Sequence, residues 1–87
     1  TRAAASEWGR FNIRANVILP LANSPGMAMW TEHNPEEAAA FVNTVPLGRV
    51  GDCEQDIGRA VAWLCSDEAS YVTGQSIGLD GGQARLV

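Results

Sequence analysis

The chain has 87 residues, of which 46% are apolar and 18% charged, and its formal net charge is −4. This composition is typical of one small globular domain and excludes a disordered, collagen-like or coiled-coil chain. We expect no nucleic acid and no membrane as partner, because six Arg against ten acidic residues leave no basic excess. The longest apolar runs, 17–22 and 60–65, are also far shorter than the roughly 20 residues of a membrane-spanning helix. The sequence therefore predicts a soluble protein.

Two absences narrow the chemistry. No Met precedes Thr1, which suggests a processed chain or a fragment, and the chain contains no lysine, so it offers no Schiff-base nucleophile. Cys53 and Cys65 are expected on one helix about 18 Å apart, which is too far for a disulfide. One histidine and no CxxC pair exclude a structural zinc site. We therefore expect no metal, reduced thiols and a cytoplasmic location.

The first part of the chain predicts a helix, a strand and a loop. Strong helix formers fill residues 2–8 and stop at Gly9, a typical residue after a helix. Apolar and polar residues alternate over Ile13–Leu19, and the end of this segment is apolar on both faces. This pattern is typical of a strand in a sheet covered by helices. Pro20 ends this strand, and a loop is expected over Leu21–His33.

Two residue groups in that loop have alternative interpretations. Met27, Met29 and Trp30 fit either an apolar pocket or packing beneath a long loop, and the sequence leaves both open. His33 is interpreted as a solvated loop residue rather than a catalytic one.

A second helix has a clear start signal. Asn34 is expected at its N-cap, Pro35 at its first position and Glu37 in a capping box. Its apolar stripe includes Phe41, and a turn is expected over Pro46–Gly51.

A third helix is expected from Asp52 to about Ser66, with Gln55 at its third position. The acidic residues of its first turn, Asp52 and Asp56 among them, are expected to complement the helix dipole rather than to bind a metal. Trp63 points about 120° away from the apolar face, which is typical of a contact with another subunit. The apolar face itself consists of Ile57, Ala60, Val61, Leu64 and Cys65.

A short final strand is predicted over Ser76–Leu79, before a tight backbone passage at Gly81 and Gly82. Helices alternating with strands predict an α/β fold with a parallel sheet. Two strands do not make a stable sheet. The chain is therefore expected to be the last portion of a doubly wound, Rossmann-type domain that is incomplete here.

The segment Gly74–Gly78 matches the G-x-S-x-G pattern of a hydrolase nucleophile elbow centred on Ser76. The elbow requires a helix directly after the serine, and the chain offers no room for one. We therefore do not favour a hydrolase and interpret Ser76 as part of an edge or interface strand.

Several short blocks of the sequence resemble those of one protein family and occur in the same order. These blocks are Trp8-Gly9, Ile13–Ile18 with Pro20, Pro46–Gly51, Asp56–Val61, Leu64–Gln75 and Leu79–Gly82. Together they resemble the C-terminal third of the short-chain dehydrogenase/reductase family. The resemblance implies NAD or NADP as cofactor, hydride transfer between the nicotinamide and a carbonyl or alcohol substrate, and a homo-oligomer, either a dimer or a tetramer.

The resemblance also implies roles for individual residues. The family's catalytic Ser, Tyr and Lys lie upstream, so no catalytic residue is expected in this chain, and Tyr71 has Gln75 where a Y-x-x-x-K pair needs Lys. The loop after the family's sixth strand lies along the nicotinamide end of the cofactor, and Leu21 stands there in place of the usual Gly. The residues implied to bind the cofactor are Pro20, Leu21 and Ser24.

Residues 27–45 resemble the family's substrate lid, with Met27, Met29 and Trp30 as lid residues. Residues 52–82 resemble its last helix and strand, which pair subunits, with Trp63 and Ser76 as interface residues. Residues 1–87 are thus expected to be a C-terminal fragment of one Rossmann-type domain, inactive alone and completed by the rest of the dehydrogenase. A non-catalytic assembly module that pairs through its strand edges stays open as the alternative.

Overall fold

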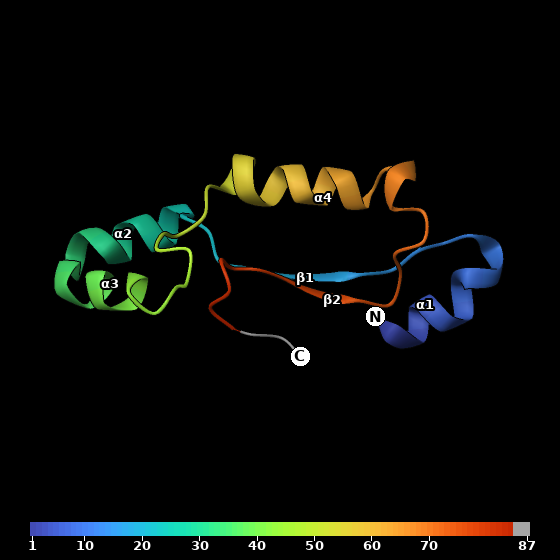
Figure 1. The fold of residues 1–87 in the computed structure, drawn as a ribbon, viewed down its shortest axis with the longest axis horizontal. Helices are drawn as coiled ribbons and strands as arrows, with labels where there is room; N and C mark the ends of the chain where they lie inside the picture. The colour runs from blue at the N-terminus through green and yellow to red at the C-terminus, as the bar shows by residue number, and fades with distance from the viewer. Residues whose placement is uncertain (85–87) are drawn as a thin grey trace.

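The computed structural model describes residues 1–84, which form several helices and one short parallel sheet (Figure 1). Strand β1 (Val17–Pro20) pairs in parallel with strand β2 (Ser76–Leu79). Helices form the connection between them, as parallel neighbours require. Helix α4 (Arg59–Leu64) lies along one side of the sheet, and the other helices lie beyond its two ends. The predicted parallel α/β arrangement and the predicted final strand are therefore confirmed.

The first helix, α1 (Arg2–Trp8), has the predicted bounds but does not end the helical segment. Gly9 keeps right-handed helical angles, φ −57° and ψ −36°, and the 3-10 turn η1 (Gly9–Phe11) continues from it. That turn stops at Asn12, whose φ of 59° is left-handed, a conformation that Asn adopts more readily than most residues. The α-helix therefore stops at Gly9 as predicted, but Gly9 is a C-cap with helical angles, and the left-handed residue lies at Asn12.

Strand β1 is shorter than the predicted strand Ile13–Leu19. The residues before it are tied to the segment before β2 by side-chain hydrogen bonds and by one backbone bond, from the Gly74 amide to the Ala15 carbonyl at 2.8 Å. The Ala15 amide donates to Thr73 Oγ1 at 3.1 Å, and Asn16 Oδ1 accepts from the Gln75 amide at 3.0 Å. The alternating pattern therefore marks an extended segment of which only the second half pairs with β2.

The segment predicted as a loop contains helix α2 (Pro25–His33), so the loop prediction is wrong. Ser24 caps this helix, because its Oγ accepts a hydrogen bond from the Met27 amide at 3.2 Å. A Ser-Pro-Gly run is typical of a turn, but Ser followed by Pro is equally typical of an N-cap and first helical position. His33 is the last residue of α2, exposed, with Nδ1 2.8 Å from the Met29 carbonyl oxygen.

A single residue, Asn34, separates helix α3 (Pro35–Val42) from the end of α2. Asn34 stands at the N-cap and Pro35 opens the helix, as predicted, but the Asn34 side chain makes no capping bond. Instead its Nδ2 and its backbone amide both donate to the Trp30 carbonyl, at 3.1 and 2.9 Å. Asn34 is therefore both the last cap of α2 and the first cap of α3, and the predicted capping box with Glu37 does not form.

The third predicted helix begins with a π-helical turn, η2 (Cys53–Gly58), that leads into α4. The predicted cap at Asp52 is confirmed, since its Oδ2 accepts from the amides of Glu54 and Gln55 at 3.0 and 2.7 Å. The helix ends at Leu64, which is buried, whereas Cys65 follows as an exposed C-cap. The other cysteine, Cys53 in η2, is also exposed, and both are free thiols.

The buried core is small. The chain exposes 6410 Å², whereas a compact protein of 9.3 kDa exposes roughly 5,000 Å². Large apolar side chains such as Phe11 and Leu47 are 62% and 70% exposed. Within residues 1–84, no helix combines the length and apolarity that crossing a membrane requires. The buried apolar residues are Ala5, Ala38, Val45, Leu64 and Ala69.

The predicted tight passage at Gly81 gives a test of the packing between the end of the sheet and the turn after α3. We expect Gly81→Ala to lower the free energy of unfolding by about 2 kcal/mol. The φ of Gly81 is +64°, and an added Cβ would lie 2.8 Å from Val45 Cγ1. Gly9→Ala is the matched control, because Gly9 has helical angles and nothing within 4 Å of an added Cβ. Equal urea midpoints for the two variants would contradict this packing.

Candidate functional site

A depression of about 560 Å³ lies where β1 ends. In open α/β sheets, ligands bind outside the carboxyl ends of the strands, so this is the expected place for a site. The depression contains all three residues implied to bind a cofactor and two of the three implied lid residues; Met29, the third, does not line it and is 63% exposed. The lining residues are Pro20, Leu21, Ala22, Ser24, Met27, Trp30 and Phe41.

An aromatic pair forms one wall of the depression. The rings of Trp30 on α2 and Phe41 on α3 meet edge to face, with centroids 6.4 Å apart and planes at 89°. This arrangement is favourable for aromatic rings and couples the two helices. Sequence reasoning placed Phe41 in an apolar stripe and missed it as a site residue, because its neighbour Trp30 was expected on a loop. Ser24 followed by Pro25, which is typical of a helix start, is the signal that could have found the pair.

Ser24 contributes the hydroxyl of this depression. Its Oγ accepts from the Met27 amide, which fixes the side chain at the start of α2. A serine hydroxyl has two acceptor positions and one donor, so accepting this bond leaves the O–H able to donate to a ligand oxygen.

Backbone hydrogen bonds hold the lining segment 21–24 from two sides. The Leu21 amide donates to the Leu79 carbonyl at 3.0 Å. From the opposite direction, Gly51 donates to the Leu21 carbonyl at 3.2 Å and accepts from the Asn23 amide at 2.7 Å. A Cβ on Gly51 would lie 3.0 Å from the Leu21 oxygen. This close approach therefore favours a glycine.

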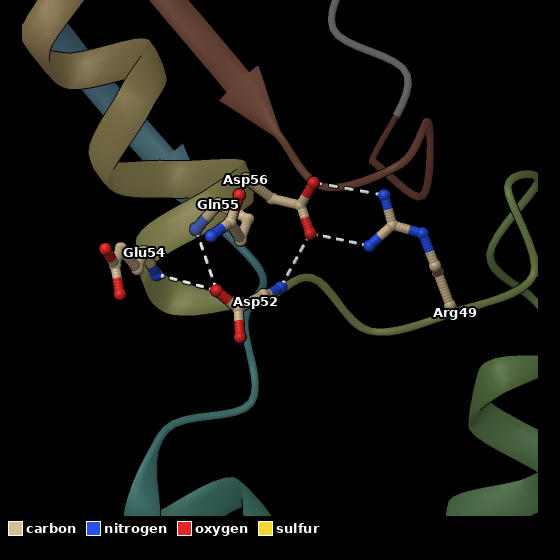
Figure 2. Close-up of polar contacts among 5 residues, drawn as sticks. All are labelled: Arg49, Asp52, Glu54, Gln55 and Asp56. Carbon is tan, nitrogen blue, oxygen red and sulfur yellow. Dashed lines mark hydrogen bonds and ion pairs between the residues drawn. The ribbon is translucent and has the colours of Figure 1, made fainter.

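Arg49 and Asp56 form an ion pair (Figure 2). An added Cβ on Gly51 would lie 3.5 Å from Asp56 Oδ2. The Arg49 guanidinium donates to both carboxylate oxygens of Asp56, at 2.5 and 3.0 Å, and Asp56 Oδ2 also accepts from the Asp52 amide at 2.7 Å. The hydrogen bond from Arg49, followed by that from Asp52, lowers the pKa of Asp56 from 3.8 to about 2. Asp52 caps the helix as expected. The negative charge of Asp56 is balanced by the guanidinium of Arg49, a partner that the sequence interpretation did not identify.

The remaining candidates lie apart from the depression. Trp63 is 47% exposed on α4, as its off-face position predicted, and Ser76 is exposed at the first position of β2. Ser76 therefore does not stand on a strand-to-helix turn, and the hydrolase elbow does not form. In the part of the chain that the structure describes, no cluster of three or more His, Cys, Asp or Glu side chains is arranged to hold a metal ion.

Comparison with known proteins assigns this geometry to a class. A family model described as enoyl-(acyl carrier protein) reductase matches residues 1–84. The crystal structure of a hydroxysteroid dehydrogenase from Escherichia coli superimposes with a TM-score of 0.84 and 33% sequence identity, covering 97% of this chain and 34% of that one. The fold is therefore that of part of a Rossmann-type α/β domain.

Sequence relatives agree with this class. A 12α-hydroxysteroid dehydrogenase from a Clostridium species is 39% identical over 85 residues, covering 98% of this chain and 33% of the relative. A probable 2,4-dienoyl-CoA reductase from Bacillus subtilis is 44% identical over 85 residues, covering 95% of this chain and 33% of the relative. The chain belongs to the short-chain dehydrogenase/reductase family. It spans about a third of the length of these relatives.

The lowered pKa of Asp56 predicts an acid dependence of stability. A carboxylate whose pKa falls on folding stabilises the fold above its unfolded pKa of about 3.8, and loses that contribution as the pH falls towards its folded pKa of about 2. The difference in unfolding free energy between the wild type and Asp56→Asn should be constant from about pH 5 to pH 7 and shrink between about pH 4 and pH 2. Denaturant unfolding across this range measures it. A difference that persists undiminished to pH 2 would contradict the pairing with Arg49.

Proposed function

We propose that this chain is the C-terminal portion of an NAD(P)-dependent oxidoreductase that transfers a hydride between the nicotinamide and a carbonyl or alcohol. One observation carries the proposal: nearly the whole chain aligns, at 39% and 44% identity, with a third of the length of a dehydrogenase and of a reductase. The rest of the polypeptide would then supply the remaining strands, the main cofactor site and the catalytic groups.

In this proposal, Pro20, Leu21 and Ser24 lie along the nicotinamide end of NAD or NADP. The depression suits that role, because its volume of about 560 Å³ and its apolar lining with one hydroxyl are typical of small-molecule sites. The cofactor supplies the hydride when bound. The residues of this chain bind and orient it: the apolar side chains exclude water, and the Ser24 hydroxyl donates to an oxygen of the cofactor.

Residues 27–45, which contain α2 and α3, form the proposed substrate lid. Met27 and Trp30 line the depression from α2 and Phe41 lines it from α3, so the lid presents an apolar surface. Such a surface suits the apolar part of a carbonyl or alcohol substrate. Met29, on the same helix, is exposed on the outside.

The proposed subunit interface lies at the last helix and strand. Trp63 exposes 47% of its surface on α4, and an exposed tryptophan is typical of protein interfaces. Ser76 begins β2, the other element of this surface. We place the protein in the cytoplasm, as a dimer or tetramer, in keeping with the two free cysteines.

The alternative function is a non-catalytic assembly module. The exposed apolar side chains and the two-stranded sheet favour it, because open strand edges and uncovered apolar surface promote association. It differs from the dehydrogenase proposal in requiring no nicotinamide cofactor.

The test compares two polypeptides, the 87-residue chain and the longer polypeptide that contains it. The longer polypeptide should oxidise NADH or NADPH in the presence of a steroid or other carbonyl substrate, followed at the absorbance of the reduced nicotinamide. The 87-residue chain should show no turnover. Turnover by the 87-residue chain would contradict the proposal. A longer polypeptide that assembles but binds neither nucleotide would instead support the assembly module.

The lid proposal predicts different effects for two neighbouring residues of α2. Trp30→Ala removes an aromatic wall of the depression and should raise the KM for the carbonyl substrate about tenfold, which corresponds to ~1.4 kcal/mol. Met29→Ala is the matched control, because Met29 does not line the depression and should change the KM less than about twofold. Steady-state kinetics of the longer polypeptide measure both. Equal effects of the two substitutions would contradict the lid geometry.

A further inference from the structure

We propose that Arg49 and Asp56 are positioning residues, which act through Gly51 to hold segment 21–24 in place against the nicotinamide end of the cofactor. This inference rests on the proposed function for the identity of the ligand. Neither Arg49 nor Asp56 lines the depression, so their effect on a ligand there is indirect.

The first step is the link between the turn after α3 and the start of the last helix. Arg49 belongs to the turn, which Gly48 shapes with a φ of +76°, and it binds the Asp56 carboxylate through two parallel hydrogen bonds. A bidentate pair fixes the orientation of both groups, which a single hydrogen bond does not. The turn is therefore held against η2 (Figure 2).

The second step places Gly51 between two fixed residues. Asp52, directly after it, is bonded to Asp56 twice: its amide donates to Oδ2 at 2.7 Å, and its carbonyl accepts from the Asp56 amide at 2.9 Å. Arg49 lies two residues before Gly51. A Cβ on Gly51 would lie 3.3 Å from the Asp56 Cβ and 3.0 Å from the Leu21 oxygen. Gly51 is therefore packed closely between the ion pair and the lining segment.

The third step is the link between Gly51 and the residues that line the depression. Gly51 forms an isolated parallel bridge with Ala22, through the Gly51 amide to the Leu21 carbonyl and the Asn23 amide to the Gly51 carbonyl. Ser24, the cap of α2, follows directly. A shift of Gly51 would therefore move both the cofactor-side residues and the start of the proposed lid.

Exposure separates this role from a general contribution to stability. The side chains of Arg49 and Asp56 are 58% and 32% exposed. Exposed ion pairs contribute little to folding stability, so breaking this pair should leave the fold intact. Loss of the ion pair should instead make the position of Gly51 less fixed, so that segment 21–24 can adopt a wider range of conformations.

The experiment measures the affinity of the longer polypeptide for two nucleotides. NADH and NADPH are titrated by the fluorescence of the reduced nicotinamide, and ADP-ribose, which lacks the nicotinamide, by calorimetry. Arg49→Ala should raise the Kd of the better reduced nucleotide about five- to tenfold and change the Kd of ADP-ribose less than about twofold. Arg49→Lys keeps the positive charge but cannot make the two parallel hydrogen bonds of a guanidinium, so it should give an intermediate Kd. Arg2→Ala, on the exposed face of α1, is the matched control and should change neither affinity.

The outcomes separate this inference from the proposed function. If the wild type binds neither reduced nucleotide, both are overturned. If the wild type binds and Arg49→Ala binds equally well, the positioning role is overturned and the proposed function stands. Equal weakening of the reduced nucleotide and ADP-ribose, together with a large drop in Tm, would show a merely structural role and would also overturn the inference.

Discussion

The parallel pairing of β1 with β2 is the interaction on which the rest of this structure depends. It joins residues near the two ends of the chain, with Val17 opposite Ser76 and Pro20 opposite Leu79. Parallel neighbours require a long crossover, and that crossover contains every element between them, from α2 to the 3-10 turn η3 (Asp67–Ala69). The depression forms where β1 leaves the sheet and the crossover begins. The position of the candidate site is therefore a consequence of strand order.

The same pairing leaves one edge of β1 without a partner in the described residues. The amides of Val17 and Leu21 donate towards β2, and alternate residues of a strand point to opposite edges, so the Ile18 amide points away from β2. Together with the small core and the 6410 Å² of exposed surface, this edge favours a larger sheet. In the proposed dehydrogenase, the rest of the domain would cover these surfaces. Family membership and the one-third coverage of the relatives agree with that proposal.

Local sequence signals predicted some elements correctly. The final strand and the Asp52 cap are correct because β-branched residues and an aspartate at a helix start act within a few positions. The loop prediction over residues 21–33 is wrong because Ser24 followed by a proline fits both a turn and a helix start. The capping box at Asn34 is wrong because its side chain bonds back to the Trp30 carbonyl of the preceding helix. The family resemblance grouped Pro20, Leu21 and Ser24, but Phe41 and the partnership of Arg49 with Asp56 depend on tertiary geometry that no spacing rule contains.

Hydrogen exchange at the Ile18 amide tests most directly the central claim that this chain is one part of a larger parallel sheet. The account predicts fast exchange in the 87-residue chain, because no strand among residues 1–84 pairs along that edge of β1. It predicts slow exchange in the longer polypeptide, where a further strand would accept the hydrogen bond. Equally fast exchange in both polypeptides would contradict the account, because the edge would then be a free surface of the finished protein.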